Sequence, residues 1–238
     1  MKVHVFKNED AASLAASMLV CAQILKKPES VIALENNLDL QSTYDKLVAF
    51  YRAGSLSVGS AKSRLTSEYA KGQFAQTNYD KLKQKFADAV HLEASGLYDF
   101  NLQTENLAVA ALNYEQTLNK LGGIDLGLLT VSETGNVLFN QANQDVYNDC
   151  HATELEYTVP AHGTDEQAKQ TVHLPVLTFG MGTLMRINTL VVLAFGRTKA
   201  ASVADLVRGK ITPACPASFL QLHKQLILIV DEAAASLI

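Results

Sequence analysis

The chain has 238 residues, 48% of them hydrophobic, and its 20 Lys and Arg residues against 24 Asp and Glu residues give a formal net charge of −4. The apolar content suffices for a large core, and the scattered basic residues argue against nucleic-acid binding. The amino terminus lacks the pattern of a signal peptide, and no apolar run approaches the ~18 residues of a membrane span, so we expect a cytoplasmic protein without membrane contact. Three widely separated cysteines, Cys21, Cys150 and Cys215, fit free thiols in that compartment.

The first third of the chain alternates strand-like and helix-like segments. Lys2–Phe6 alternates in polarity, as a short strand does, and Val31–Leu34 is an apolar run typical of a buried strand. Between them, Asn8 or Asp10 can cap a helix. The apolar stripe expected on that helix consists of Leu14, Met18, Cys21 and Leu25. A second helix is predicted over residues 43–52, and the resulting β-α-β-α order is typical of a doubly wound sheet.

The middle of the chain is less regular. Residues 78–91 predict a helix, and Thr104 can cap a stronger one. The stripe of that stronger helix consists of Leu107, Ala111, Tyr114, Leu118 and Leu121. Residues 124–131 have the pattern of a central strand. Residues 145–165 are polar and predict a loop that contains one strand, at residues 155–159.

The last third contains a strand-to-helix junction that could bind an anion. Two glycines on either side of Met181 indicate a tight turn that opens a short helix, and residues 191–195 predict a strand buried on both faces. Gly196 then turns the chain into a helix over residues 200–207, with Lys199 at its start. Backbone N–H groups, the helix dipole and this lysine would together form an anion site. A plain junction with a surface lysine is the alternative.

The carboxy-terminal residues complete the predicted fold. They predict a short helix over residues 217–223, a last buried strand over 226–230 and a helix over 233–237. Without a repeat or linker in the chain, we expect a single domain over residues 1–238. We predict a three-layer α/β/α architecture of Rossmann type with a mostly parallel sheet, and a ligand crevice at the carboxyl ends of its strands.

Four motifs in the last third resemble one enzyme family. They are Gly180-Met-Gly-Thr-Leu184, Gly196-Arg-Thr-Lys-Ala200, Pro216-Ala-Ser-Phe-Leu-Gln-Leu-His223 and Val230-Asp-Glu-Ala233. In order and spacing they resemble the glucosamine-6-phosphate deaminases, also called glucosamine/galactosamine-6-phosphate isomerases, which are related to the 6-phosphogluconolactonases. The resemblance covers nearly the whole chain. It implies carbohydrate metabolism: an aldose–ketose isomerisation of an amino-sugar phosphate, followed by loss of ammonia, without a metal or other cofactor.

The resemblance places the family's catalytic groups on residues of other types. The Asp that moves the proton between C1 and C2 falls on Ser67, and the ring-opening His falls on Asn136. The carboxylates that orient this His fall on Thr134 and Gln141. Because none of these four side chains exchanges protons near neutrality, we predict that the chain is catalytically impaired.

The phosphate cradle of the family is also replaced. Its glycine loop falls on residues 36–40, which include Asn36, Asn37 and Asp39, and residues 158–170 contain no match to the family's phosphate Arg. The family's phosphate Lys is kept as Lys199. Asp39 would repel a phosphate ~4 Å away by roughly 4 kcal/mol at an effective dielectric constant near 20. A sugar or sugar phosphate remains the expected ligand, and Asp39 favours a neutral sugar.

Other interpretations stay open. Glu68 and Glu133 lie beside the replaced positions and could act as relocated carboxylates in an active sugar-phosphate isomerase or hydrolase. The chain could instead be a non-catalytic interaction subunit, as part of a homo-oligomer or beside an intact homologue. Cys150 and His151 could form a thiol–imidazole pair, although adjacent residues seldom face each other. Three histidines at eleven-residue spacing could bind zinc, although closer ligands would be needed. They are His151, His162 and His173.

Overall fold

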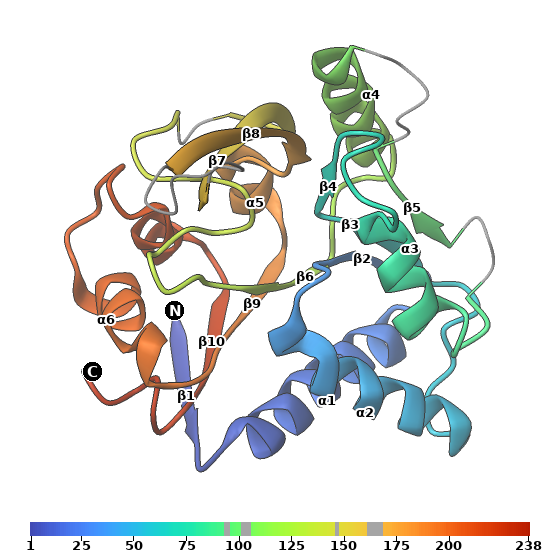
Figure 1. Ribbon diagram of the computed structural model, residues 1–238. Coiled ribbons are helices and arrows are strands. Elements are labelled where there is room, and N and C mark those ends of the chain that lie inside the picture. Colours follow the sequence, from blue (N-terminus) through green and yellow to red (C-terminus); the bar gives the residue numbers. More distant parts are fainter. Residues whose placement is uncertain (93–95, 101–105, 146–147, 161–168) are drawn as a thin grey trace.

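The computed structural model describes the backbone of residues 1–92, 96–100, 106–145, 148–160 and 169–238, and the side chains of all of these except 157–160 and 169–170. A seven-stranded sheet in the order β1-β10-β9-β6-β2-β3-β5 runs through the molecule (Figure 1), and every neighbouring pair in it is parallel. In sheet order its strands are β1 (Lys2–Phe6), β10 (Leu226–Asp231), β9 (Thr189–Ala194), β6 (Leu126–Thr130), β2 (Val31–Leu34), β3 (Lys62–Leu65) and β5 (Leu97–Tyr98).

Helices cover both faces of this sheet because its central strands are apolar on both sides. All residues of β2 and β6 are buried, so each face of the sheet needs its own apolar layer. One layer comes from α1 (Glu9–Lys26), α2 (Gln41–Arg52), α3 (Asn78–Leu82) and the π-helical turn Lys83–Ala87. The other comes from α4 (Leu107–Lys120), α5 (Met181–Arg186), α6 (Ala200–Arg208) and the 3₁₀ segment Pro216–Leu222. The predicted three-layer α/β/α fold is thereby confirmed.

A second, antiparallel sheet was missed by the sequence prediction. It consists of β4 (Ser67–Tyr69), β8 (Lys169–Thr178) and β7 (His151–Pro160) in that order. The strand predicted at residues 155–159 is confirmed as part of β7, which is longer than predicted, whereas its antiparallel partner β8 was not predicted. Its side chains at Leu155, Val176 and Leu177 are buried, whereas Glu154 is exposed. Polar residues on the solvated face made the rest of the β7–β8 hairpin look like a loop.

The predicted apolar stripe of α1 was also wrong. Leu14, Met18 and Leu25 are 41%, 58% and 71% exposed. The face that packs against α2 and β10 is instead made of small residues and two branched ones. These residues are Ala12, Ser13, Ala16, Ser17, Val20 and Ile24. Small side chains let a helix approach its neighbours closely, so the larger residues lie outside.

Two other helix predictions had opposite outcomes. The stripe of α4 is confirmed, with Ala111, Tyr114 and Leu118 buried. The N-cap of α4 is Asn106, whose side chain accepts a hydrogen bond from Val109 N; Thr104 lies outside the described residues. Residues 233–237 form turns and not the predicted helix. Among the described helices, none has the length and apolar character needed to cross a bilayer.

A buried carboxylate joins α4 to α5 and to the start of β7. Glu115 is 6% exposed and accepts hydrogen bonds from Thr183 Oγ1 at 2.7 Å, Arg186 Nη2 at 2.7 Å and Cys150 N at 3.1 Å. Burial raises the pKa of Glu115, but the hydrogen bonds from Thr183 and Cys150 and the charge of Arg186 outweigh it, so the pKa lies below its ordinary value of 4.5. The network fixes the segment that precedes β9.

Glu115→Gln is expected to lower the free energy of unfolding by about 2 kcal/mol at pH 7, because a charged acceptor of three hydrogen bonds is lost. A carboxyl group whose pKa is lowered by folding stabilises the folded state fully when the pH is above the pKa of the unfolded chain. That stabilisation is lost as the pH falls through the pKa of the folded state. The difference between wild type and variant should therefore be constant above pH ~5 and shrink below it. Urea unfolding from pH 3 to 8 measures this. Asp149→Asn is the control, because Asp149 contacts the same Arg186 but is 53% exposed; it should cost less than ~1 kcal/mol.

Candidate functional site

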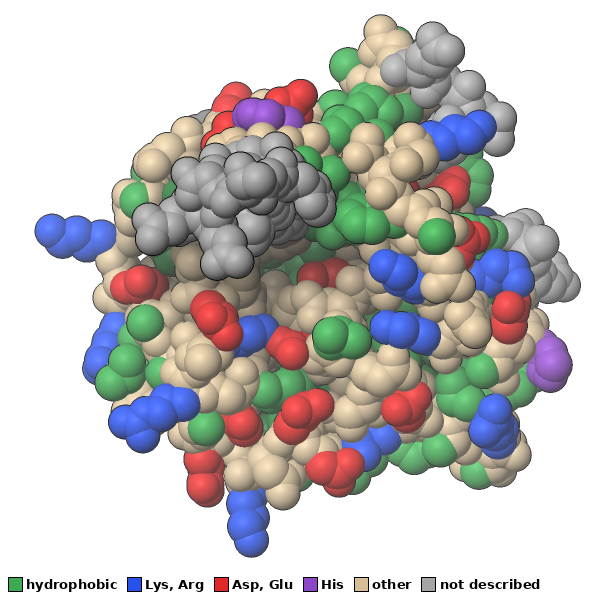
Figure 2. Space-filling view, viewed as in Figure 1, with side chains coloured by type: hydrophobic (Ala, Val, Ile, Leu, Met, Phe, Trp, Pro, Cys, Tyr) green, Lys and Arg blue, Asp and Glu red, His purple; other side chains and the backbone are tan. Residues whose placement is uncertain are grey.

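The strand order defines where a ligand crevice belongs. After β2 the chain adds β3 and β5 on one side, and it then returns to place β6 on the other side of β2. Ligands of open α/β sheets bind outside the carboxyl ends of the strands at such a reversal. The residues after Leu34 in β2 and Thr130 in β6 therefore form the floor of the candidate site. On the face shown in Figure 2, Lys and Arg side chains are interspersed with Asp and Glu, with no single basic cluster.

A carboxylate fills the point where the strand order reverses. Glu35 directly follows β2, is 6% exposed, and its Oε2 accepts a hydrogen bond from Thr130 N at 2.6 Å. Asn37 Nδ2 donates to Glu35 Oε1 and to Thr130 Oγ1, both at 2.9 Å. Burial raises the pKa of Glu35. The hydrogen bonds from Asn37 and Thr130 and the charge of Lys199 lower it, but they do not outweigh the effect of burial. The sequence analysis did not single out Glu35, although a Glu at the end of an apolar strand is itself a signal.

The predicted anion site holds a carboxylate of the chain itself. Lys199 Nζ forms an ion pair with Asp39 Oδ2, and the two side chains are 12% and 30% exposed. Gly196, with φ of +83°, turns the chain from β9 into the 3₁₀ turn Arg197–Lys199 that precedes α6. Its N–H donates to Asp231 Oδ1 at 3.1 Å and so does not face an external anion. Lys199 is therefore neither a surface lysine nor an unpaired one.

Asn36 and Ser67 are connected through a residue that sequence reasoning missed. Asn36 Nδ2 donates to Asn78 Oδ1 at 2.9 Å, and Asn78 Nδ2 donates to Ser67 O at 3.1 Å. Ser67 is 4% exposed and pairs with Thr178 of β8. Ser67, to which the resemblance assigns the proton-moving Asp, thus lies in a buried strand that Asn78 links to Asn36.

Glu68 serves as a helix cap. It is 1% exposed, and its carboxylate accepts hydrogen bonds from the backbone N–H groups of Tyr69, Asn78 and Tyr79 at 2.8–2.9 Å. Burial raises the pKa of Glu68 in spite of these three donors. The carboxylate therefore holds the start of α3, whereas Glu133 is exposed in the turn after β6.

The remaining predicted positions share one loop at the carboxyl end of β6. Ser132 Oγ accepts hydrogen bonds from Asn136 N at 2.9 Å and from Thr134 N at 3.3 Å. Thr134 is exposed, and Asn136 and Gln141 are half-buried. Further along the loop, Asn140 Nδ2 donates to Phe179 O at 2.9 Å.

Aromatic contacts bring this loop beside β4. The ring centroid of Tyr69 lies 5.2 Å from that of Phe139 and 4.6 Å from that of Phe74. Phe139 N also donates to Thr178 Oγ1 at 3.4 Å, and Thr178 pairs with Ser67. The structure therefore places the Ser67 strand next to the loop that carries Asn136. Phe74 is 47% exposed and gives this edge an accessible apolar surface.

The cysteine and histidine alternatives find no support in the geometry. Burial raises the pKa of the Cys150 thiol well above its ordinary value, and the neighbouring charge of Glu115 adds to this. His151 Nδ1 lies 2.9 Å from Asp149 O, within its own loop. His173 Nδ1 lies 3.5 Å from Glu154 Oε2, and His162 lies outside the described residues. In the part of the chain that the structure describes, no three His, Cys, Asp or Glu residues form a group able to hold a metal ion.

Curated relatives identify the family. The chain is 30% identical to the glucosamine-6-phosphate deaminase of Clostridioides difficile (strain 630) over 239 aligned positions, which cover 99% of this chain and 96% of that relative. The chain belongs to the glucosamine-6-phosphate deaminase family. A glucosamine-6-phosphate deaminase of Clostridium botulinum (strain Langeland) is 26% identical, over 99% of this chain and 98% of that relative. No family model matches the chain.

Solved structures confirm the fold. A monomeric glucosamine-6-phosphate deaminase superposes with a TM-score of 0.89 at 24% identity and covers both chains completely. The 6-phosphogluconolactonase of Thermotoga maritima superposes with a TM-score of 0.74 at 14% identity, over 97% of this chain and 99% of the other. The family predicted from the motifs of the last third is thus confirmed.

Proposed function

We propose that this family member does not catalyse the deaminase reaction and binds an unphosphorylated sugar at the carboxyl edge of its sheet. The observation that carries the proposal is the ion pair between Lys199 and Asp39. Lys199 is the position that the family uses for the phosphate of its substrate, and here a carboxylate already neutralises it. A phosphate ester would have to displace Asp39 and would meet its negative charge.

The residues around the proposed site support the loss of proton transfer. Ser67 and Asn136 replace the family's base and imidazole, and neither titrates near neutrality. Glu68 and Glu35 are buried carboxylates, but both are engaged by hydrogen-bond donors of the fold. Amide and hydroxyl groups remain, and these suit the hydroxyls of a neutral sugar.

The activity test uses both family substrates. We expect purified chain, incubated with glucosamine-6-phosphate or galactosamine-6-phosphate, to release ammonia and ketose phosphate at least ~10²–10⁴ times more slowly than a deaminase of the family. The Clostridioides difficile relative, assayed in parallel, is the positive control. Turnover within tenfold of that enzyme would refute the proposal, and Glu35→Gln and Glu68→Gln would then identify the carboxylate responsible.

The binding test compares sugars with their phosphates. A ligand that binds the folded state raises the melting temperature as its concentration exceeds Kd. We expect glucosamine or galactosamine to raise it and their 6-phosphates to have less effect at the same ionic strength. The reverse order would contradict the assigned role of Asp39. A single domain over residues 1–238 and a cytoplasmic location stay predictions.

A further inference from the structure

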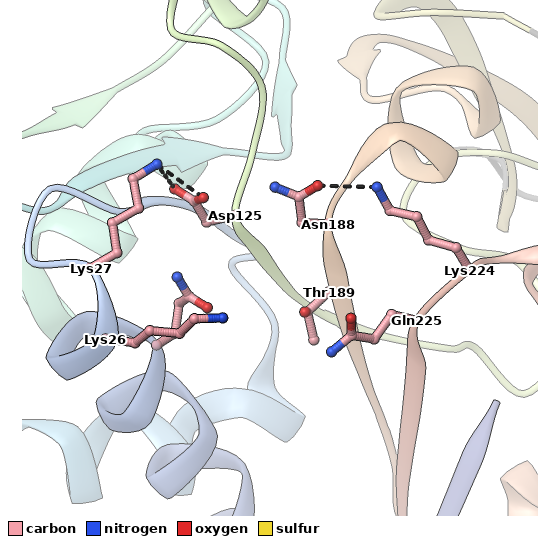
Figure 3. Close-up of a pocket in the computed structure, with 8 residues that line it drawn as sticks. Lys26, Lys27, Asp125, Asn188, Thr189, Lys224 and Gln225 are labelled. Carbon is pink, nitrogen blue, oxygen red and sulfur yellow. Dashed lines mark hydrogen bonds and ion pairs between the residues drawn. The ribbon is translucent and has the colours of Figure 1, made fainter.

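A groove opens at the amino ends of the strands, on the opposite edge of the sheet from the candidate site. It has a volume of about 740 Å³, within the ~300–1,000 Å³ typical of small-molecule sites. Lys26 and Lys27 at the end of α1 form one wall, and Asp125 precedes β6 (Figure 3). Asn188, before β9, and Lys224, before β10, form the opposite wall. The groove therefore lies between segments that are distant in the sequence.

The lining of this groove is positively charged although the chain as a whole is negative. It contains three lysines against one carboxylate, whereas the formal net charge of the chain is −4. The carboxylate is already used, because Asp125 holds Lys27 Nζ at 2.9 and 3.0 Å and accepts a hydrogen bond from Val31 N at 2.8 Å. Among the described residues, Lys26 and Lys224 have no acidic partner within ion-pair distance.

Two of the three lysines of the groove are held in place by hydrogen-bond partners. Asp125 fixes Lys27 through both of its carboxylate oxygens. Lys224 Nζ donates to Asn188 Oδ1 at 3.0 Å, and Figure 3 shows the Asn188 amide between that lysine and the Lys27–Asp125 pair. Fixing such side chains beforehand lowers the entropy cost of binding. Three lysine ammonium groups and the neutral polar side chains of Gln23, Thr189 and Gln225 thus surround the space.

We propose that this groove binds a small phosphorylated anion with two or more negative charges. Ammonium groups on two walls suit a compact ligand whose oxygens accept hydrogen bonds from several directions. Lysine binds phosphate as a point charge. A neutral sugar would leave Lys26 and Lys224 without a counter-charge. The proposal does not depend on the proposed function, since the two sites lie at opposite edges of the sheet.

Inorganic pyrophosphate is the probe, titrated by calorimetry at an ionic strength held constant with NaCl. We expect saturable 1:1 binding to the wild-type chain and binding at least ~10-fold weaker in Lys26→Gln/Lys224→Gln, a loss of ~1.4 kcal/mol. Lys120→Gln is the matched control, because Lys120 ends α4 as Lys26 ends α1. It should bind pyrophosphate like the wild type.

Two results would overturn the assignment: no saturable heat with the wild-type chain, or equal weakening by Lys120→Gln and the double variant. Equal weakening would mean that pyrophosphate responds only to the overall charge of the chain or to lysines at helix ends, and not to this groove. Both replaced side chains of the double variant are exposed, and circular dichroism checks that it folds. If it does not fold, Lys26→Gln and Lys224→Gln measured singly should each weaken binding, and wild-type affinity in both would refute the proposal.

Discussion

Gly180→Ala is expected to destabilise the chain by at least ~3 kcal/mol, at the upper end of the range for overpacked positions. A Cβ atom at this position would lie 1.9 Å from Asn148 O and 2.3 Å from Asp149 O. Both are backbone atoms, which cannot swing aside as the end of a side chain can. The φ of Gly180 is −82°, a value that alanine adopts freely, so the cost comes from space alone. Asn148 O also accepts a hydrogen bond from Gly182 N at 3.0 Å, so relieving the clash would break the contact that seats the start of α5.

Urea unfolding and thermal melting measure this loss, and the melting temperature should fall by ~6–12 °C for a chain of this size. Gly59→Ala is the control, because a Cβ there would meet no atom within 4 Å; it should change stability by less than ~0.5 kcal/mol. Equal stability of the two variants would show that the loop around Asn148 does not contact Gly180 as closely as described.

The elements that could be predicted from sequence are those buried on both faces. The strands β2, β6, β9 and β10 are short apolar runs, and only a central strand needs such a run. Only part of β7 was predicted, and β8 was missed, because polar positions of these strands face solvent. The stripe of α1 was misassigned because both sides of that helix carry apolar residues, and periodicity does not say which side meets the sheet.

The candidate site was predictable in outline only. The predicted α/β class placed it at the carboxyl ends of the strands, whereas the reversal of strand order between β2 and β6 became visible only in the structure. The pairing of Asp39 with Lys199 had no local signal, because the two residues are 160 positions apart. The partners of Glu68 are backbone N–H groups, which a sequence does not mark, so its role as a cap appeared only in three dimensions.

Asp39→Asn is expected to strengthen the binding of glucosamine-6-phosphate at least ~10-fold, because it frees Lys199 and removes the repulsion between the carboxylate and the phosphate. At 4 Å that repulsion is roughly 4 kcal/mol, and screening by solvent reduces it. The measurement belongs in the Lys26→Gln/Lys224→Gln background, so that the groove at the opposite edge cannot contribute. Binding of glucosamine itself should change little, because the side-chain volume is kept. Asp205→Asn is the control: it makes the same change in net charge at an exposed position of α6.

The same variant should lose stability and regain it with ligand. Without Asp39 the ammonium of Lys199, whose side chain is 12% exposed, loses its ion-pair partner. We expect a loss of stability of about 1–2 kcal/mol, less than for a fully buried pair because Asp39 is partly exposed. A phosphate that binds Lys199 restores stability in proportion to ln(1 + [L]/Kd). Rescue of Asp39→Asn by glucosamine-6-phosphate, but not by glucosamine, would show that Asp39 occupies the place of the phosphate. If the phosphate neither binds more tightly nor rescues the variant, the ion pair is structural, and ligand choice must depend on the amides and hydroxyls around Glu35.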